Sequence, residues 1–396
     1  MPSDLIKQAY KKSIELLIRN SSSSGFLAAR PKRTKLNVLL HYDWIFGRDA
    51  SICSLGAIAS GQKELIKTAR RTLITLARQQ TKSGQIPNAV NENETKVEYY
   101  YLSSVDATLW WLIAIKYYQK YSRDKKTYKL LEPRVNRALK WLNSQTGGET
   151  NLLVQSQAGD WADLMPVHGH ALYSNALWYW LQDLYKLKGR DMTMAGIRAV
   201  FYPFKRQTGS IFYKKNFLYP RLRDFIRKRI KTTDYYLSYV STYTAGRHCD
   251  VYGNILALML GLPDAKLKKK ILNYFLKQKI SVPYPVRVLD NPILKSEREW
   301  NEVMEHYDKN RPWHYHNAGI WPYVGGFWVI MLYKIGQKKI AKIELGKLAL
   351  VNKVNNWQFN EWFNGQTGQS QGMPGQSWNA AMFILAYHCL KGDFKL

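Results

Sequence analysis

The chain has 396 residues, of which 46% are hydrophobic and 14% aromatic, so it can bury a large core and global disorder is excluded. The formal net charge of +30 suggests an anionic partner. However, the lysines and arginines are spread along most of the expected helices, which favours a solvated basic surface over a nucleic-acid-binding stripe.

Compartment is inferred from the cysteines and the apolar runs. Cys53, Cys249 and Cys389 lie far apart in apolar stretches, which indicates buried thiols in a reducing compartment. The first twenty residues form a charged amphipathic pattern rather than a signal peptide. The longest apolar run, YVGGFWVIMLY, is too short to span a bilayer. We therefore expect a soluble cytoplasmic protein that has no membrane partner.

Helical periodicity dominates the chain, and strand-like alternation is scarce. In chain order, the expected helices cover residues 3–20, 48–60, 63–80, 104–122, 132–145, 170–187, 191–203, 217–231, 249–261, 264–279, 319–335, 337–353 and 374–391.

These helices form pairs. Short turns join the two helices of a pair near residues 59–64, 188–193, 261–266 and 334–339, whereas long segments rich in Trp, His, Asn, Gln and acidic residues separate the pairs. Long loops within a domain usually carry function. An array of about six helical hairpins closed into a ring is an (α/α)6 barrel, which is the all-α fold that we predict. The alternative is an open α-solenoid, which a strict sequence repeat would favour.

We expect residues 1–396 to form one domain, with residues 1–38 as an accessory helix and arm. The long loops are predicted to converge at one end of the barrel. The basic segment 205–231 is expected to face solvent, away from any pocket.

The first two acidic groups lie at helix starts. Arg48 and Asp49 follow Trp44, and such an Arg–Asp pair can bind sugar hydroxyls, although Asp49 can equally serve as a first-turn acid. Asp106 begins the helix that carries Trp110 and Trp111, where a capping role competes with a substrate contact.

The stretch from Trp161 to Tyr185 combines carboxyls, histidines and aromatic residues. Asp160 and Asp163 flank Trp161 in a loop upstream of a helix, and His168 follows them. A carboxyl beside tryptophan and other apolar groups has its neutral form favoured, as a general acid requires. Further along, Asp250 and Asn254 lie one turn apart on an apolar helix, which suits either a structural role or a pocket wall.

Two later segments carry similar groups. His314 and His316 precede Asn317 and Trp321, and without a third ligand nearby they indicate hydrogen bonding rather than metal binding. Glu361 lies among Trp357, Phe359, Trp362 and Phe363, ahead of a loop rich in Gly and Gln that includes Gln376. A solvated acid does not need these neighbours, whereas a catalytic carboxylate in a sugar site does.

The order of these segments resembles that of the (α/α)6 glycoside hydrolases, specifically the amylo-1,6-glucosidase domain of glycogen debranching enzymes. The neutral/alkaline invertases are the next closest likeness. The pieces that carry the resemblance span residues 40–392: GRDASI, GQIPN, SVDATLWW, DWAD, GNILALMLG, HNAGIWP, NEWFNG and GMPGQSWNAAM.

The resemblance implies an inverting mechanism with Asp163 as general acid and Glu361 as general base, and the DWAD motif leaves Asp160 as a competitor for the acid. Because a general acid must hold a proton near neutral pH, we expect Asp163 to lie in a drier environment than Glu361. It also implies that the substrate contacts are Trp44, Arg48, Asp49, Asp106, Asp160, Trp161, His168, His316, Asn317, Trp321, Trp362 and Gln376. On this interpretation Trp161, Trp321 and Trp362 stack on sugar faces. No metal or organic cofactor is implied.

The expected substrate is a short oligosaccharide or a disaccharide with an α-glucosidic bond, because this length leaves no room for the domains that hold polysaccharide in debranching enzymes. The alternatives are sucrose hydrolysis, a sugar-binding relative without catalysis, and a basic solenoid that binds nucleic acid. The last alternative leaves the aromatic and acidic loops unexplained.

Overall fold

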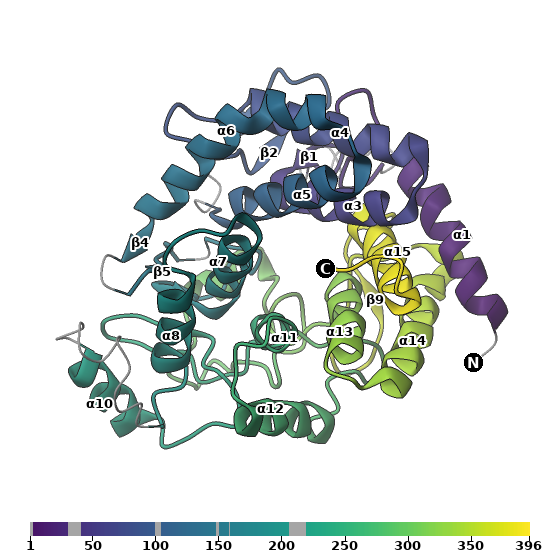
Figure 1. The fold of residues 1–396 in the computed structure, drawn as a ribbon. Coiled ribbons are helices and arrows are strands. Elements are labelled where there is room, and N and C mark those ends of the chain that lie inside the picture. Colours follow the sequence, from purple (N-terminus) through teal and green to yellow (C-terminus); the bar gives the residue numbers. More distant parts are fainter. Residues whose placement is uncertain (1–2, 31–40, 100–103, 148–149, 158, 206–218) are drawn as a thin grey trace.

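The computed structural model describes residues 3–30, 41–99, 104–147, 150–157, 159–205 and 219–396. Within them, all thirteen expected helices are present. Six helices form an inner ring in which each contacts the next and α15 closes against α3 (Figure 1). In chain order, they are α3 (Gly47–Ser60), α5 (Asp106–Ser122), α7 (Leu172–Tyr185), α11 (Val251–Met259), α13 (Pro322–Lys334) and α15 (Ser377–Lys391).

The outer layer holds the second helix of each hairpin. It consists of α4 (Lys63–Arg78), α6 (Lys125–Ser144), α8 (Arg190–Val200), α12 (Ala265–Lys277), α14 (Lys338–Trp357) and α1 (Ser3–Arg19). Two further elements lie in long loops, namely α10 (Tyr219–Arg229) and the 3₁₀ helix η2 (Glu302–Asp308). This arrangement is the predicted (α/α)6 barrel.

Composition explains which helix lies in which layer. Every residue of α3 from Gly47 to Ala59 is buried, and α13 and α11 are apolar on all sides, as befits helices enclosed by neighbours. Outer helices have one apolar stripe: α12 buries Leu267, Ile271 and Phe275, which are four residues apart.

Two helices differ from the sequence expectation. Helix α6 begins at Lys125 rather than near 132, because Pro133 is accommodated inside it. Helix α1, expected as an accessory, is the outer partner of α15, where Tyr10 hydrogen-bonds His388. Helix α14 leaves helical geometry at Val354, which agrees with the expected end near 353.

The strands are two-residue antiparallel pairs within the long loops. β1 (Ile45–Phe46), β2 (Ala89–Val90) and β3 (Val97–Glu98) form one sheet. The other pairs are β4 (Thr146–Gly147) with β5 (Leu152–Leu153), β6 (His170–Ala171) with β7 (Tyr239–Val240), and β8 (Trp362–Phe363) with β9 (Ser370–Gln371).

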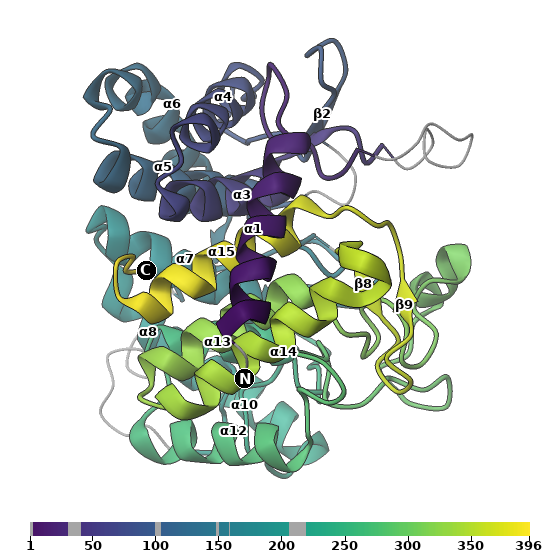
Figure 2. The same ribbon diagram turned by 90° about the vertical axis from the view of Figure 1, so that its right-hand side faces the viewer.

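The long loops gather at one end of the barrel, as predicted. Figure 2 shows β2, β8 and β9 on the side opposite the C terminus. The inner helices begin at this end, so their positive N-terminal dipole ends face the loops that carry the candidate site.

Candidate active site

Arg48, in the first turn of α3, lies between the carboxylates of Asp49 and Asp106. Its Nη1 is 3.2 Å from Oδ2 of Asp106, and its Nε is 3.2 Å from Oδ2 of Asp49. Asp106 is completely buried and also accepts hydrogen bonds from Tyr173 and Ser104. Asp106, which the sequence placed among the substrate contacts, therefore serves to hold Arg48.

Asp160 has a fully engaged carboxylate. Its Oδ2 accepts from Nε2 of Gln155 at 2.9 Å, and its Oδ1 accepts from the amide of Ala162 at 2.9 Å. Burial, reinforced by the nearby Asp106, raises the pKa of Asp160 to about 6. With both oxygens bound, Asp160 is suited to shaping the loop rather than to transferring a proton.

Asp163 differs in having no hydrogen bond on its carboxyl group from any residue that the structure describes. Burial raises the pKa of Asp163 to about 7, with Arg48 and Lys309 acting in the opposite direction. A carboxyl group that retains a proton near neutral pH and has free oxygens can donate that proton to a ligand.

Glu361 lies immediately before β8. Its Oε2 accepts from the hydroxyl of Tyr42 at 2.8 Å and from the amide of Met373 at 3.0 Å. Burial raises the pKa of Glu361, and these two hydrogen bonds oppose that shift because they stabilise the ionised form. Both bonds end on Oε2, which leaves Oε1 to orient a water molecule.

Asp163 was expected to be less exposed to solvent than Glu361, and the structure shows the reverse. Glu361 is only 6% exposed, whereas Asp163 is partly exposed. The pKa of Asp163 is still raised, mainly by burial, and the negative charges of Asp106 and Asp160 add smaller contributions.

Asp163 and Glu361 share neighbours, which places them around the same space. Burial raises the pKa of Tyr315 well above its ordinary value, and the charges of Asp163 and then Glu361 raise it further. Burial raises the pKa of Tyr42 likewise, with further contributions from Glu361 and, among the smaller ones, Asp163. Neither tyrosine was identified from the sequence.

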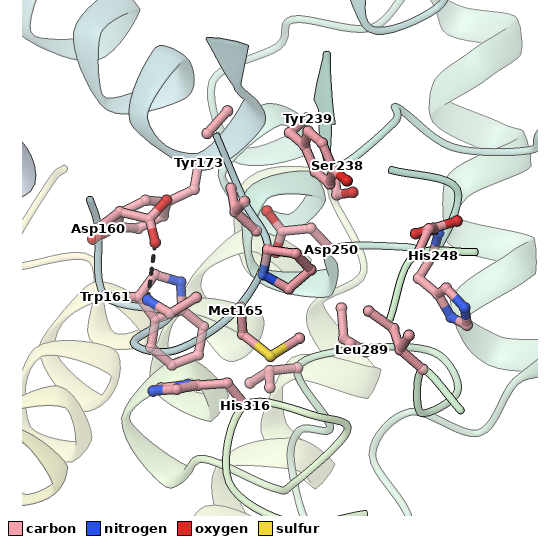
Figure 3. Close-up of a pocket in the computed structure, with 17 residues that line it drawn as sticks. Asp160, Trp161, Met165, Tyr173, Ser238, Tyr239, His248, Asp250, Leu289 and His316 are labelled. Carbon is pink, nitrogen blue, oxygen red and sulfur yellow. Dashed lines mark hydrogen bonds between the residues drawn. The ribbon is translucent and has the colours of Figure 1, made fainter. Parts of the chain in front are cut away.

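Trp161, in the loop that carries Asp160 and Asp163 (the acid loop), forms an aromatic contact with His316 (Figure 3). Their ring centroids are 4.6 Å apart, and His316 stacks on Trp321 at 4.7 Å. Both ring nitrogens of His316 are buried without a hydrogen-bond partner among the described residues. Burial lowers the pKa of His316 well below its ordinary value, so the ring is neutral and can offer a donor and an acceptor to a ligand.

Two predicted contacts do not face the site. Trp321 is 1% exposed and covered by His316, so it has no free face for a sugar. Asn317 is fully buried, and its side chain bonds to the backbone of Ile293 and Asn310. Both residues hold the loop that presents His316.

His168 is held by neighbouring side chains and backbone. Its ring bonds to Thr244 and to the carbonyl of Pro166, and it packs on Tyr239. Both ring nitrogens of His168 therefore have partners within the protein.

The remaining predicted contacts lie at other points of the same end. Gln376 precedes α15 with its Nε2 buried and, among the described residues, unpartnered, as is Nε1 of the nearby Trp378. Trp362 packs edge-on against Tyr315, with the two ring centroids 6.1 Å apart. Trp44 is partly exposed and packs on His41, with the two ring centroids 4.4 Å apart.

One side of the acid loop lines a pocket (Figure 3). Asp160 and Trp161 form one wall, and Asp250 contributes a carboxyl to another. Asp250 also caps α11 by accepting from the amide of Gly253, and burial raises its pKa to about 7. Asn254 is buried and bonds to the backbone of Tyr236, so it has only a structural part.

The basic segment behaves as predicted over the residues that can be described. In α10 and just beyond it, Arg221, Arg227, Lys228, Arg229 and Lys231 are exposed, whereas Arg223 is partly buried and donates to the carbonyl of Pro203. Positions 206–218 of the predicted segment lie outside the described residues.

Over the described ranges, no cluster of three His, Cys, Asp or Glu side chains is arranged to hold a metal ion. Within the same ranges, no helix combines the length and apolar character that a membrane crossing requires.

A barrel of six helical hairpins with carboxyl groups at the loop end defines the class of six-hairpin glycosidases. Residues 21–385 match the family amylo-alpha-1,6-glucosidase, and the chain belongs to this family of glycoside hydrolases.

Known relatives agree with this assignment. The chain is 22% identical over 338 residues to neutral/alkaline invertase 1, mitochondrial, of Oryza sativa subsp. japonica, covering 72% of this chain and 50% of the relative. It is 24% identical over 342 residues to alkaline/neutral invertase C, mitochondrial, of Arabidopsis thaliana, covering 72% of this chain and 48% of the relative. The chain thus spans about half the length of these curated relatives.

A solved structure shares the fold. The GH63 mannosylglycerate hydrolase from Thermus thermophilus in complex with glucose superposes with a TM-score of 0.66 at 14% identity, covering 95% of this chain and 99% of the other.

Proposed function

We propose that this protein is an inverting glycoside hydrolase that cleaves an α-glucosidic bond in a short oligosaccharide or disaccharide. The observation that carries the proposal is the contrast between Asp163 and Glu361 around one space. Asp163 retains a proton and has free oxygens, whereas Glu361 is tethered through one oxygen only.

In this mechanism Asp163 protonates the glycosidic oxygen as the bond to the sugar breaks. Glu361 takes a proton from a water that attacks the opposite face of the sugar, which inverts the anomeric carbon. Inversion requires roughly 6.5–9.5 Å between the two carboxyl groups, because the water must fit between them. His316 and Gln376 retain ring or amide nitrogens without a partner among the described residues, and these atoms suit sugar hydroxyls.

Sucrose hydrolysis is the second candidate, because the matches to invertases cover 72% of the chain. A sugar-binding protein without catalysis is disfavoured by the presence of both candidate carboxyl groups.

The test is a product assay on a panel of α- and β-linked oligosaccharides and sucrose, followed by proton NMR during the first turnovers. We expect an α-glucoside to release β-glucose first. If sucrose is the only member of the panel that is hydrolysed, the invertase activity is favoured. A sugar product that retains the configuration of its anomeric carbon would contradict the inverting mechanism.

A further inference from the structure

Lys309 is a cation that the mechanism does not use. It follows η2, is partly buried, and its ammonium lies 5.0 Å from the ring centroid of Tyr315. In the part of the chain that the structure describes, no carboxylate lies within ion-pair distance of this ammonium, and no group hydrogen-bonds to it. Arg48, the other cation of the site, is already paired with Asp49 and Asp106.

Lys309 lies where the leaving group of the substrate is expected to bind. The next residue, Asn310, donates from Nδ2 to the backbone oxygen of Asp163 at 3.2 Å. Lys309 therefore lies beside the acid loop. The general acid protonates the oxygen of the departing group, so that group must lie next to Asp163.

We propose that Lys309 binds an anionic group, a carboxylate or a phosphate, on the leaving-group part of the substrate. This assignment rests on the proposed glycosidase function and narrows its substrate class. An unpaired ammonium in a partly dry site gains a charge-assisted bond from such a group. The net charge of +30 also favours encounter with anionic substrates.

An anion on Lys309 also affects the acid. The charge of Lys309 lowers the pKa of Asp163, and an anion bound to Lys309 offsets that charge. The groups whose charges act on Asp163 are Arg48, Lys309, Asp106 and Asp160, and Tyr42 and Tyr315 face it as neutral phenols because their own pKa values are raised well above the ordinary value. Since Asp163 must be protonated to act, kcat for an anionic substrate should persist to higher pH than kcat for a neutral one.

The test uses two probes that differ in charge, the α-glucoside of 4-hydroxybenzoate and its methyl ester. Binding is measured by tryptophan fluorescence in the Glu361→Gln variant, in which turnover is suppressed. We expect the acid to bind about tenfold or more tightly than the ester. In the Lys309→Met background this preference should disappear, and Lys309→Arg should retain it.

Lys338→Met is the matched control, because Lys338 lies 5.6 Å over the ring of Tyr333 but belongs to the outer helix α14. Lys338→Met should keep the preference for the acid over the ester.

If the parent enzyme hydrolyses neutral glucosides while acid and ester bind equally, the Lys309 proposal fails and the proposed function stands. If Lys309→Met shifts the pH profiles of both probes equally without changing their relative affinity, Lys309 tunes the acid and the proposal is again overturned. If neither probe binds and no glycoside is hydrolysed, both proposals fail together.

Discussion

At the scale of single residues, the two carboxyl groups make the sharpest prediction. Asp163→Asn and Glu361→Gln keep the shape of each side chain but remove its proton chemistry. Each should lower kcat by ~10²–10⁴ or more while sugar binding survives. Asp160→Asn should cost much less, because both oxygens of Asp160 are already hydrogen-bonded. If Asp160→Asn abolishes turnover and Asp163→Asn leaves it intact, the acid has been assigned to the wrong residue.

Tyr42 provides a test through pH. Its hydrogen bond stabilises the ionised form of Glu361 and so opposes the rise in pKa that burial causes. Removing the hydroxyl in Tyr42→Phe should raise the pKa of Glu361. Because the base must be ionised, the acidic limb of kcat/KM should move to higher pH, by up to about one unit. A profile that keeps its acidic limb while kcat falls evenly would contradict this role.

Asn310 is predicted to position the acid. It is fully buried, donates to the carbonyls of Asp163 and Leu164, and accepts from the amide of His316. Asn310→Ala should therefore lower kcat on natural glycosides by about 10–10³-fold. Glucosyl fluoride, whose leaving group needs little protonation, should be spared. Equal losses on both substrates, measured at matched folded fraction, would indicate a purely structural role.

The sequence was informative where chemistry is local. A carboxyl among aromatic neighbours identified Asp163 and Glu361 as candidates, and both lie at the loop end. Asn310, Tyr42 and Lys309 could not be identified in this way, because each acts on a residue far away in sequence. The burial of Trp321 beneath His316 likewise depends on packing that no local pattern records.

At the scale of elements, alternation of short turns and long loops was enough to predict a hairpin barrel, since it determines which helix ends lie together. The start of α6 was missed because the expected start lay beside Pro133, a residue type that favours helix starts, whereas the helix accommodates this proline in its interior. The pairing of α1 with α15 joins the two ends of the chain, and no local signal predicts such a contact.

The closure of the inner ring depends on a close approach of α3 and α15. A β-carbon at Gly56 would meet the backbone of Ala381. Gly56→Ala should therefore destabilise the protein by about 1–3 kcal/mol through overpacking, measured by urea unfolding. Gly61→Ala is the comparison: it has open space but a φ of 68°, so it should cost only the backbone strain of about 1 kcal/mol. A Gly56→Ala variant as stable as the parent would show that the two helices can separate freely.

At the scale of the whole molecule, most helical lysines and arginines lie on the outer helices and α10, whereas Asp160, Asp163, Asp250 and Glu361 lie just outside the inner helices, at the loop end. The apolar inner helices desolvate the loop-end carboxyl groups, so the same packing that closes the barrel raises their pKa values. Asp160, Asp163 and Asp250 all show this direction of shift, to about 6, 7 and 7. The fold thus retains protons at its loop end, and its stability should depend on pH.

Asp250 is suited to testing this dependence, because it lines the pocket beside the acid loop and is not one of the two proposed catalytic carboxyl groups. Its pKa is raised from 3.8 to about 7 in the folded protein, so the folded state binds more protons than the unfolded state between these values. The stabilising contribution of protonated Asp250 is complete below pH 3.8 and is lost as pH rises towards 7.

Asp250→Asn keeps a residue that can cap α11 and removes the titration. The free energy of unfolding of the variant, relative to the parent, should therefore rise between pH 4 and pH 8 by about 1–3 kcal/mol, less than the full shift implies because Asp250 is partly exposed. Taking differences between variants cancels the changing repulsion among the many surface cations, which would obscure the effect in the parent alone. An Asp250→Asn difference that is the same at both pH values would mean that this carboxyl is already ionised in the folded barrel.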